Sequence, residues 1–154
     1  MDLGGILSSM TFDELKKMVE KDVVLDDTEL DRESMRTPQL HNKYLSLYHD
    51  MKLIKRKYET EYRILRKRKW EYYSGKMSEE EMKELGWEPF QQRVLRQDLE
   101  MFLESDMDLI KIRGRIEYQQ EKCDYLEGIV KSLSSRQWTI RNAIEWRKFT
   151  HGIN

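Results

Sequence analysis

A strict three-and-four spacing of residues near the C-terminus constrains the fold of this chain more than any other feature. The spacing holds without interruption over five consecutive heptads. The positions are Leu109, Ile112, Ile116, Gln119, Cys123, Leu126, Val130, Leu133, Gln137, Ile140 and Ile144. So narrow a stripe predicts a long helix packed against partner helices, either from this chain or from other copies. We name these positions the C-terminal seam, and we allow a break in the helix at Gly114, at Gly128 or over 132–135.

A second heptad pattern predicts another long helix upstream. Thr37 and Pro38 suit a helix start, with a capping residue followed by proline at the first helical position. Apolar residues recur at steps of three and four over 40–65, so we expect one helix to about Tyr73, ended by Gly75. Tyr72 and Tyr73 are expected to close a helical hairpin or, alternatively, to serve as stacking platforms.

Shorter helices are expected around these two. Thr11 with Glu14, and Ser78 with Glu81, each form a capping-box pattern. We expect helices over 12–23, from about Glu29, over 79–85, and from Pro89 to Leu103, with a loose leader over 1–10. The segment 23–30 can also be read as extended, because it holds β-branched residues.

Composition supports an all-α class. Hydrophobic residues make up 38% and charged residues 37%, which favours exposed helices and coiled coils over a compact sphere. Cys123, the sole cysteine, fits a reducing compartment, and no apolar run is long enough for a membrane span. We expect a single domain in three segments: acidic short helices over 1–36, a basic long helix with acidic connecting helices over 37–105, and an oligomerisation helix over 106–154.

The most informative chemical pattern is a basic stripe. Residues 38–76 carry eleven basic and four acidic side chains. At about 100° per residue, one side of the upstream helix, opposite its heptad pattern, gathers a tryptophan and several cations. They are Lys52, Lys55, Arg56, Arg63, Arg66, Lys67 and Trp70. Cations for phosphates and an aromatic ring for bases are what single-stranded nucleic acid requires. A solvated coiled-coil face is the alternative, although Glu59 is the only acid within the stripe.

Two neighbours of this stripe are less clear. Arg68 belongs to the same dense basic run, and Lys69 falls near the packing side of the helix.

At the other end of the chain Trp138, Trp146 and Phe149 lie off the C-terminal seam. They predict a second apolar surface for a neighbouring subunit. We expect the oligomer contacts among Leu126, Val130, Leu133, Trp138, Ile140, Ile144, Trp146 and Phe149.

Two blocks of sequence resemble a known family. Asp22-Val-Val-Leu-Asp-Asp-Thr-Glu-Leu30 and Lys67-Arg-Lys-Trp-Glu-Tyr-Tyr-Ser-Gly75, followed by an acidic middle and a long C-terminal helix, resemble the UvsY family of T4-like bacteriophages. The resemblance implies a recombination mediator without catalytic activity. Such a protein binds single-stranded DNA, forms a ring of six or seven copies, and loads a phage RecA-like recombinase onto DNA covered by the phage single-strand-binding protein. It implies the cytoplasm of an infected bacterial host as the location.

The resemblance also assigns residues. The family's two DNA-binding positions, separated by one residue, correspond to Lys67 and Lys69, and its self-assembly helix corresponds to 126–149. About twenty additional N-terminal residues and Trp70, where the family has an aliphatic residue, are departures. The rival hypotheses are a coiled-coil scaffold or virion protein without DNA binding, and a small enzyme. For the enzyme we find no catalytic, metal or cofactor constellation around the three histidines.

Overall fold

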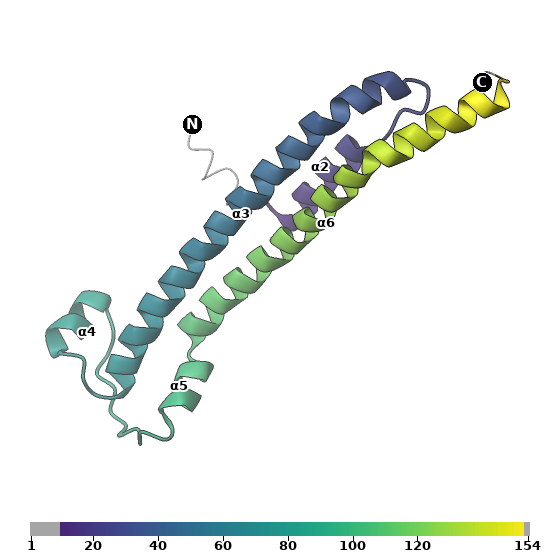
Figure 1. Ribbon diagram of the computed structural model, residues 1–154. Helices are drawn as coiled ribbons and strands as arrows, with labels where there is room; N and C mark the ends of the chain where they lie inside the picture. The colour runs from purple at the N-terminus through teal and green to yellow at the C-terminus, as the bar shows by residue number, and fades with distance from the viewer. Residues whose placement is uncertain (1–9, 153–154) are drawn as a thin grey trace. The chain divides into compact units, whose positions relative to one another are not determined.

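The computed structural model describes residues 10–152, and the all-α class is confirmed. The described residues form five helices and no strand. The helices are α2 (Phe12–Val23), α3 (Leu30–Tyr73), α4 (Glu79–Leu85), α5 (Leu99–Ser105) and α6 (Met107–Thr150) (Figure 1). The expected leader lies, apart from Met10, outside the described residues. No described helix is apolar over a length sufficient to cross a membrane.

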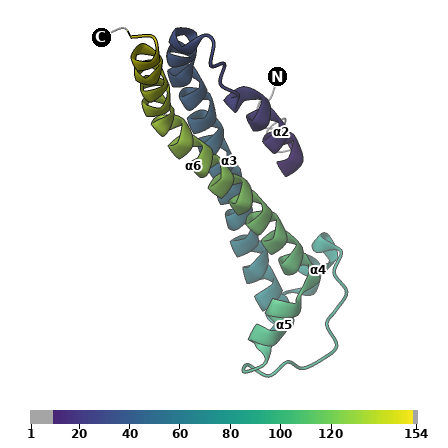
Figure 2. The ribbon, with the colours of Figure 1, turned by 90° about the vertical axis from the view of Figure 1, so that its right-hand side faces the viewer.

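The chain divides into two compact units. The first contains residues up to Ile54 and from Gln120 onward, and the second contains Lys55–Gln119. The long helices α3 and α6 contribute to both units, and within each unit they lie side by side and antiparallel (Figure 2). The expected segments 1–36, 37–105 and 106–154 follow the chain rather than these units, and they stay a prediction.

In the first unit α2 packs against α3 and α6. The Thr11 hydroxyl accepts from the Glu14 amide at 3.2 Å, and the Glu14 carboxylate accepts from the Thr11 amide at 2.7 Å, so the predicted capping box is confirmed. Leu15 and Val19 are buried on the inner side of α2. They join a core of side chains from α3 and α6, namely Leu40, Tyr44, Leu47, Met51, Cys123, Leu126 and Leu133.

The start of α3 differs from the prediction. The helix begins at Leu30, and Pro38 lies inside it rather than at its first position. Proline has no amide proton, so the carbonyl of Ser34, four residues earlier, lacks its helical donor. The Gln137 side-chain amide donates to this carbonyl at 3.0 Å. The Thr37 hydroxyl donates to the Glu33 carbonyl at 2.8 Å instead of capping a helix. These contacts let the helix continue through the proline.

The helix α6 is uninterrupted from Met107 to Thr150. None of the breaks allowed for it occurs. Gly114 and Gly128 both face open space, where a Cβ atom would meet nothing within 4 Å. The hydroxyl of Ser134 donates to the carbonyl four residues earlier at 3.0 Å, within the helix. Four residues in the middle of the C-terminal seam pack against α2 and α3 in the first unit, so their partner helices come from this chain. They are Cys123, Leu126, Val130 and Leu133, and Cys123 is buried as expected.

The connection between α4 and α5 is less helical than predicted. The helix expected from Pro89 to Leu103 is limited to Leu99–Ser105, while α4 matches its prediction. The reason is an aromatic cluster: the ring of Phe90 lies 5.1 Å from that of Tyr73 and 5.9 Å from that of Phe102. Packing of Phe90 there keeps its segment out of a helix. The neighbouring Tyr72 hydroxyl donates to the Glu88 carbonyl at 2.7 Å, so both tyrosines close the hairpin.

Candidate nucleic-acid interface

Four residues of the predicted basic stripe line one surface hollow in the second unit. Arg63, Arg66, Lys67 and Trp70 enclose about 300 Å³ on the outer side of α3. Their spacing of three, one and three residues brings them to one side of a helix. The indole of Trp70 is 37% exposed and therefore accessible to a ligand. This hollow, defined by these four residues, is the candidate site.

The cations of the hollow differ in their partners. Arg63 donates to the Glu59 carbonyl at 3.3 Å and to the Thr60 hydroxyl at 3.3 Å. No carboxylate pairs with Arg63 among the described side chains. Lys67, with 77% of its side chain exposed, lies 3.6 Å from the Glu71 carboxylate. Each can therefore offer positive charge to a phosphate.

Arg66 is the most constrained cation of the hollow. Its Nη2 atom lies 2.5 Å from Oε1 of Glu100 on α5. The hydrogen bond to this carboxylate raises the pKa of Arg66 above its usual value, against the opposing effect of burial. Glu100 therefore acts as a counterion that the protein itself supplies.

The aromatic member of the hollow also has a partner. The ammonium group of Lys76 lies 4.4 Å from the centroid of the Trp70 ring. A cation at this distance is attracted to the face of an indole. Lys76 therefore adds positive charge beside the hollow, although the sequence pattern did not point to it.

The remaining members of the stripe lie toward the N-terminal end of α3. Lys55 pairs with Glu59 at 3.1 Å, and Arg56 is exposed with no carboxylate partner within residues 10–152. Lys52 belongs to the first unit, where its ammonium group lies 5.1 Å from the Tyr48 ring centroid. The expectation that acidic partners are scarce was too simple, since α5 and the following turn of α3 also supply carboxylates to the stripe.

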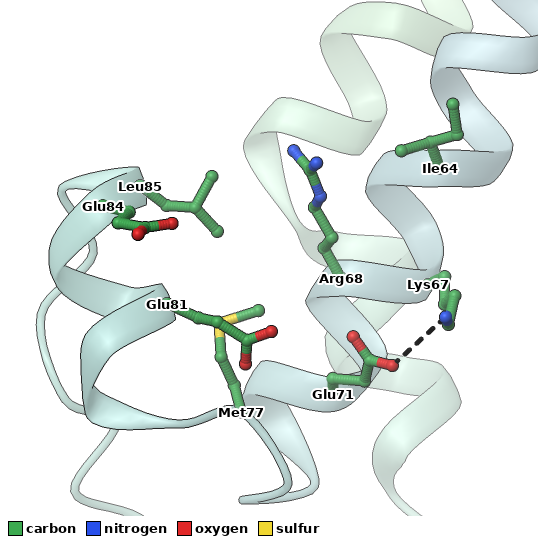
Figure 3. Close-up of a pocket in the computed structure, with 8 residues that line it drawn as sticks. All are labelled: Ile64, Lys67, Arg68, Glu71, Met77, Glu81, Glu84 and Leu85. Carbon is green, nitrogen blue, oxygen red and sulfur yellow. Dashed lines mark ion pairs between the residues drawn. The ribbon is translucent and has the colours of Figure 1, made fainter.

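Arg68 does not line the hollow. It lines a neighbouring pocket of about 440 Å³ beside α4, which shares Lys67 with the hollow (Figure 3). Three carboxylates line the same pocket, those of Glu71, Glu81 and Glu84. This acidic lining disfavours a phosphate ligand near Arg68. Placement in this pocket therefore does not support Arg68 as a principal DNA contact.

Lys69 is buried on the packing side of α3, as the helical wheel indicated. The whole residue is 7% exposed. Its ammonium group lies 2.9 Å from Asp106 and 2.7 Å from Asp108, and 4.4 Å from the centroid of the Trp87 ring. Burial alone would lower the pKa of Lys69, but hydrogen bonds to the two carboxylates outweigh it and raise the pKa. The ammonium group is already paired, so we leave Lys69 out of the candidate site.

Asp106 organises the other side of this pair. Its carboxylate accepts from the amides of Asp108 at 3.0 Å and Leu109 at 3.1 Å, at the start of α6. The Tyr73 hydroxyl donates to it at 2.7 Å. Burial would raise the pKa of Asp106, but the hydrogen bonds from Tyr73, Lys69 and Leu109 together hold it below its usual value. The link between this residue and the basic run could not be read from the local sequence.

The residues expected to mediate oligomer contacts fall into two groups. Leu126, Leu133 and Ile140 are buried within this chain, so they are not available to another copy. Val130 packs against the first unit's core, and Ile144 is partly buried. The aromatic residues are exposed instead: Trp138 by 65%, Trp146 by 66% and Phe149 by 75%. The rings of Trp146 and Phe149 lie 5.9 Å apart and form one apolar patch.

The described residues contain no group of three or more histidine, cysteine or acidic side chains arranged to hold a metal ion. The arrangement on α3 is that of a binding surface, with separated cations around an aromatic ring.

Comparison with known proteins adds a family. Residues 18–153 match the family described as "Recombination, repair and ssDNA binding protein UvsY". The recombination protein uvsY of Enterobacteria phage T4 is 24% identical over 143 residues, which cover 93% of this chain and 99% of that protein.

Crystal structures of the bacteriophage T4 recombination mediator protein UvsY have the same fold. The type II lattice form aligns with a TM-score of 0.80 at 23% identity, covering 92% of this chain and 98% of that one. The type I form gives a TM-score of 0.78 at 23% identity, over 89% and 98% of the two chains.

Proposed function

The chain belongs to the UvsY family of recombination, repair and single-stranded DNA-binding proteins, and from this premise we propose that it is a recombination mediator. In this proposal it binds single-stranded DNA and loads a RecA-like recombinase onto DNA covered by single-strand-binding protein. It acts without a catalytic step, in the cytoplasm of an infected bacterial host.

The observation that carries the DNA-binding part is the hollow around Trp70. Arg63 and Lys67 offer exposed positive charge, and the indole of Trp70 in the same hollow offers a ring for an unstacked base. Any base has a π-face and any phosphate a charge, so such a site binds with little preference for sequence. A mediator that works along arbitrary DNA requires this property.

The proposal also includes assembly into a ring of six or seven copies. The exposed patch of Trp146 and Phe149 supports it, since large aromatic residues on the surface mark contacts with other chains. A ring would present several hollows to one strand, so weak contacts would add through avidity. The strand would be held extended, with its remaining surface open to the recombinase.

Recombinase assembly on covered DNA tests this proposal. Single-stranded DNA would first be saturated with the cognate single-strand-binding protein, and filament formation would then be followed with and without the chain. We expect the wild type to shorten the lag before assembly, and Trp70→Ala to weaken this effect. Lys17→Gln, at an exposed position of α2, is the control. DNA binding without any effect on the lag would contradict the mediator role, while absence of binding would favour the scaffold hypothesis.

A further inference from the structure

We propose that DNA binding at the hollow is an exchange reaction, in which phosphates displace carboxylates that the protein itself holds against Arg66 and Lys67. The inference rests on the proposed function, because it assumes that single-stranded DNA occupies the hollow. It assigns a role in regulating affinity to Glu100, which lies outside the basic run.

The Glu100 carboxylate can be displaced from Arg66 by a phosphate. The two charged groups lie 2.5 Å apart, yet the side chains are 41% and 63% exposed. Water can therefore solvate the carboxylate as soon as it leaves the guanidinium group. Exposed pairs of this kind stabilise a protein only slightly. A phosphate can thus replace Glu100 without opening the core.

The other groups of the hollow have similar internal partners. The ammonium group of Lys67 lies 3.6 Å from Glu71, one helical turn away. Lys76 covers part of the Trp70 ring at 4.4 Å, the surface on which a base would stack. An incoming nucleotide therefore replaces existing contacts instead of filling an empty site.

Exchange lowers the affinity of each hollow for DNA. A phosphate gains the attraction of Arg66 only after Glu100 has moved away, so the net gain is a difference between two similar interactions. Each interaction is then weak and readily reversed, while several copies together keep the strand bound. Such a surface can release DNA stepwise to a protein that binds it more tightly.

The chain offers a matched control for the charge of Glu100. Glu104 lies on the same short helix and is also exposed. No basic side chain within the described part of the chain forms an ion pair with it. Glu104→Gln therefore removes one negative charge from α5 without releasing Arg66. Comparison with Glu100→Gln separates the loss of the ion pair from the change in net charge that both variants share.

The experiment measures binding to a fluorescent oligothymidylate by anisotropy at low salt. We expect Glu100→Gln to bind about two- to five-fold more tightly than Glu104→Gln, the size typical of an exposed ion pair. The Arg66→Gln variant should lose affinity. In that background the two glutamate substitutions should have equal effects, because the group released by Glu100→Gln is then absent.

Two results would overturn this inference while the proposed function stands. One is equal affinity of Glu100→Gln and Glu104→Gln for the oligonucleotide. The other is a gain from Glu100→Gln that persists undiminished with Arg66→Gln. Failure of the wild type and of every variant to bind at low salt would instead contradict the proposed function, and the inference with it.

Discussion

Lys69 lies 2.9 Å from Asp106, in a pair that joins the C-terminal end of α3 to the residue that precedes α6. Both residues are buried, with exposed fractions of 7% and 6%. The resemblance to the family places Lys69 in a DNA-binding motif together with Lys67. The geometry separates the two: Lys67 faces the solvent, and Lys69 holds the hairpin closed beside the hollow.

The first prediction distinguishes these two roles. Lys69→Met should lower the free energy of unfolding by about 2–3 kcal/mol, because it leaves a buried carboxylate without its charged partner. Lys67→Gln should leave stability nearly unchanged and reduce the salt dependence of DNA binding. Urea denaturation and salt titration of both variants measure the two effects. A stable Lys69→Met protein with a reduced salt slope would show that Lys69 contacts phosphate directly.

The second prediction concerns pH. The pKa of Asp106 in the folded protein lies below its usual value of 3.8, so this group contributes stability above that pH. The contribution is lost as the pH falls through the lower, folded-state pKa. Asp106→Asn keeps a capping side chain but removes the charge.

We therefore expect Asp106→Asn to be less stable than wild type at pH 7, and the difference to shrink as the pH falls below about 4. Chemical denaturation across this range measures it. A difference that stays constant with pH would mean that the charge of Asp106 contributes nothing, and that only its shape matters.

The third prediction tests how α3 accommodates its internal proline. Gln137→Ala should cost about 1 kcal/mol, since the Ser34 carbonyl loses the donor that lies 3.0 Å away. Pro38→Ala restores a backbone amide to that carbonyl, so Gln137→Ala should cost little in the Pro38→Ala background. Thermal unfolding of the four proteins gives the coupling. If Gln137→Ala costs as much stability in the Pro38→Ala protein as in the wild type, the Gln137 side chain does not compensate for the proline.

Heptad spacing made the two long helices predictable, and the capping boxes made α2 and α4 predictable. The same spacing could not show that one chain supplies both sides of the seam, because a stripe does not identify its partner. The start of α3 was missed because the donor for Ser34 is Gln137, 103 residues away. Local sequence contains no sign of such a contact.

The hollow was predictable for a related reason. The sides of a single helix follow from residue numbers alone, so Arg63, Lys67 and Trp70 could be placed together. Glu100 and Asp106 could not, since they come from segments whose position depends on the aromatic cluster around Phe90. Whether a cation on α3 is free to contact a phosphate depends on such carboxylates from distant segments, which the local sequence does not reveal.

The fourth prediction concerns assembly. A double substitution, Trp146→Ser with Phe149→Ser, should reduce the size of the oligomer, because it removes the exposed apolar patch on α6. Met35→Ser is the control, since Met35 is 79% exposed on α3. Light scattering after size-exclusion chromatography measures the mass. An unchanged oligomer in the double variant would place the subunit contacts elsewhere.

The most direct test of the central claim is the salt dependence of binding to single-stranded DNA. Wild type should bind at low salt, and its affinity should fall steeply as salt rises. In the Arg63→Gln and Lys67→Gln double variant the slope should decrease by about 0.7 for each phosphate that the protein no longer neutralises. Trp70→Ala should weaken binding with little change in slope, and Lys17→Gln on α2 should match wild type. An unchanged slope in the double variant, or no binding by wild type at low salt, would contradict the proposed DNA-binding role of the hollow.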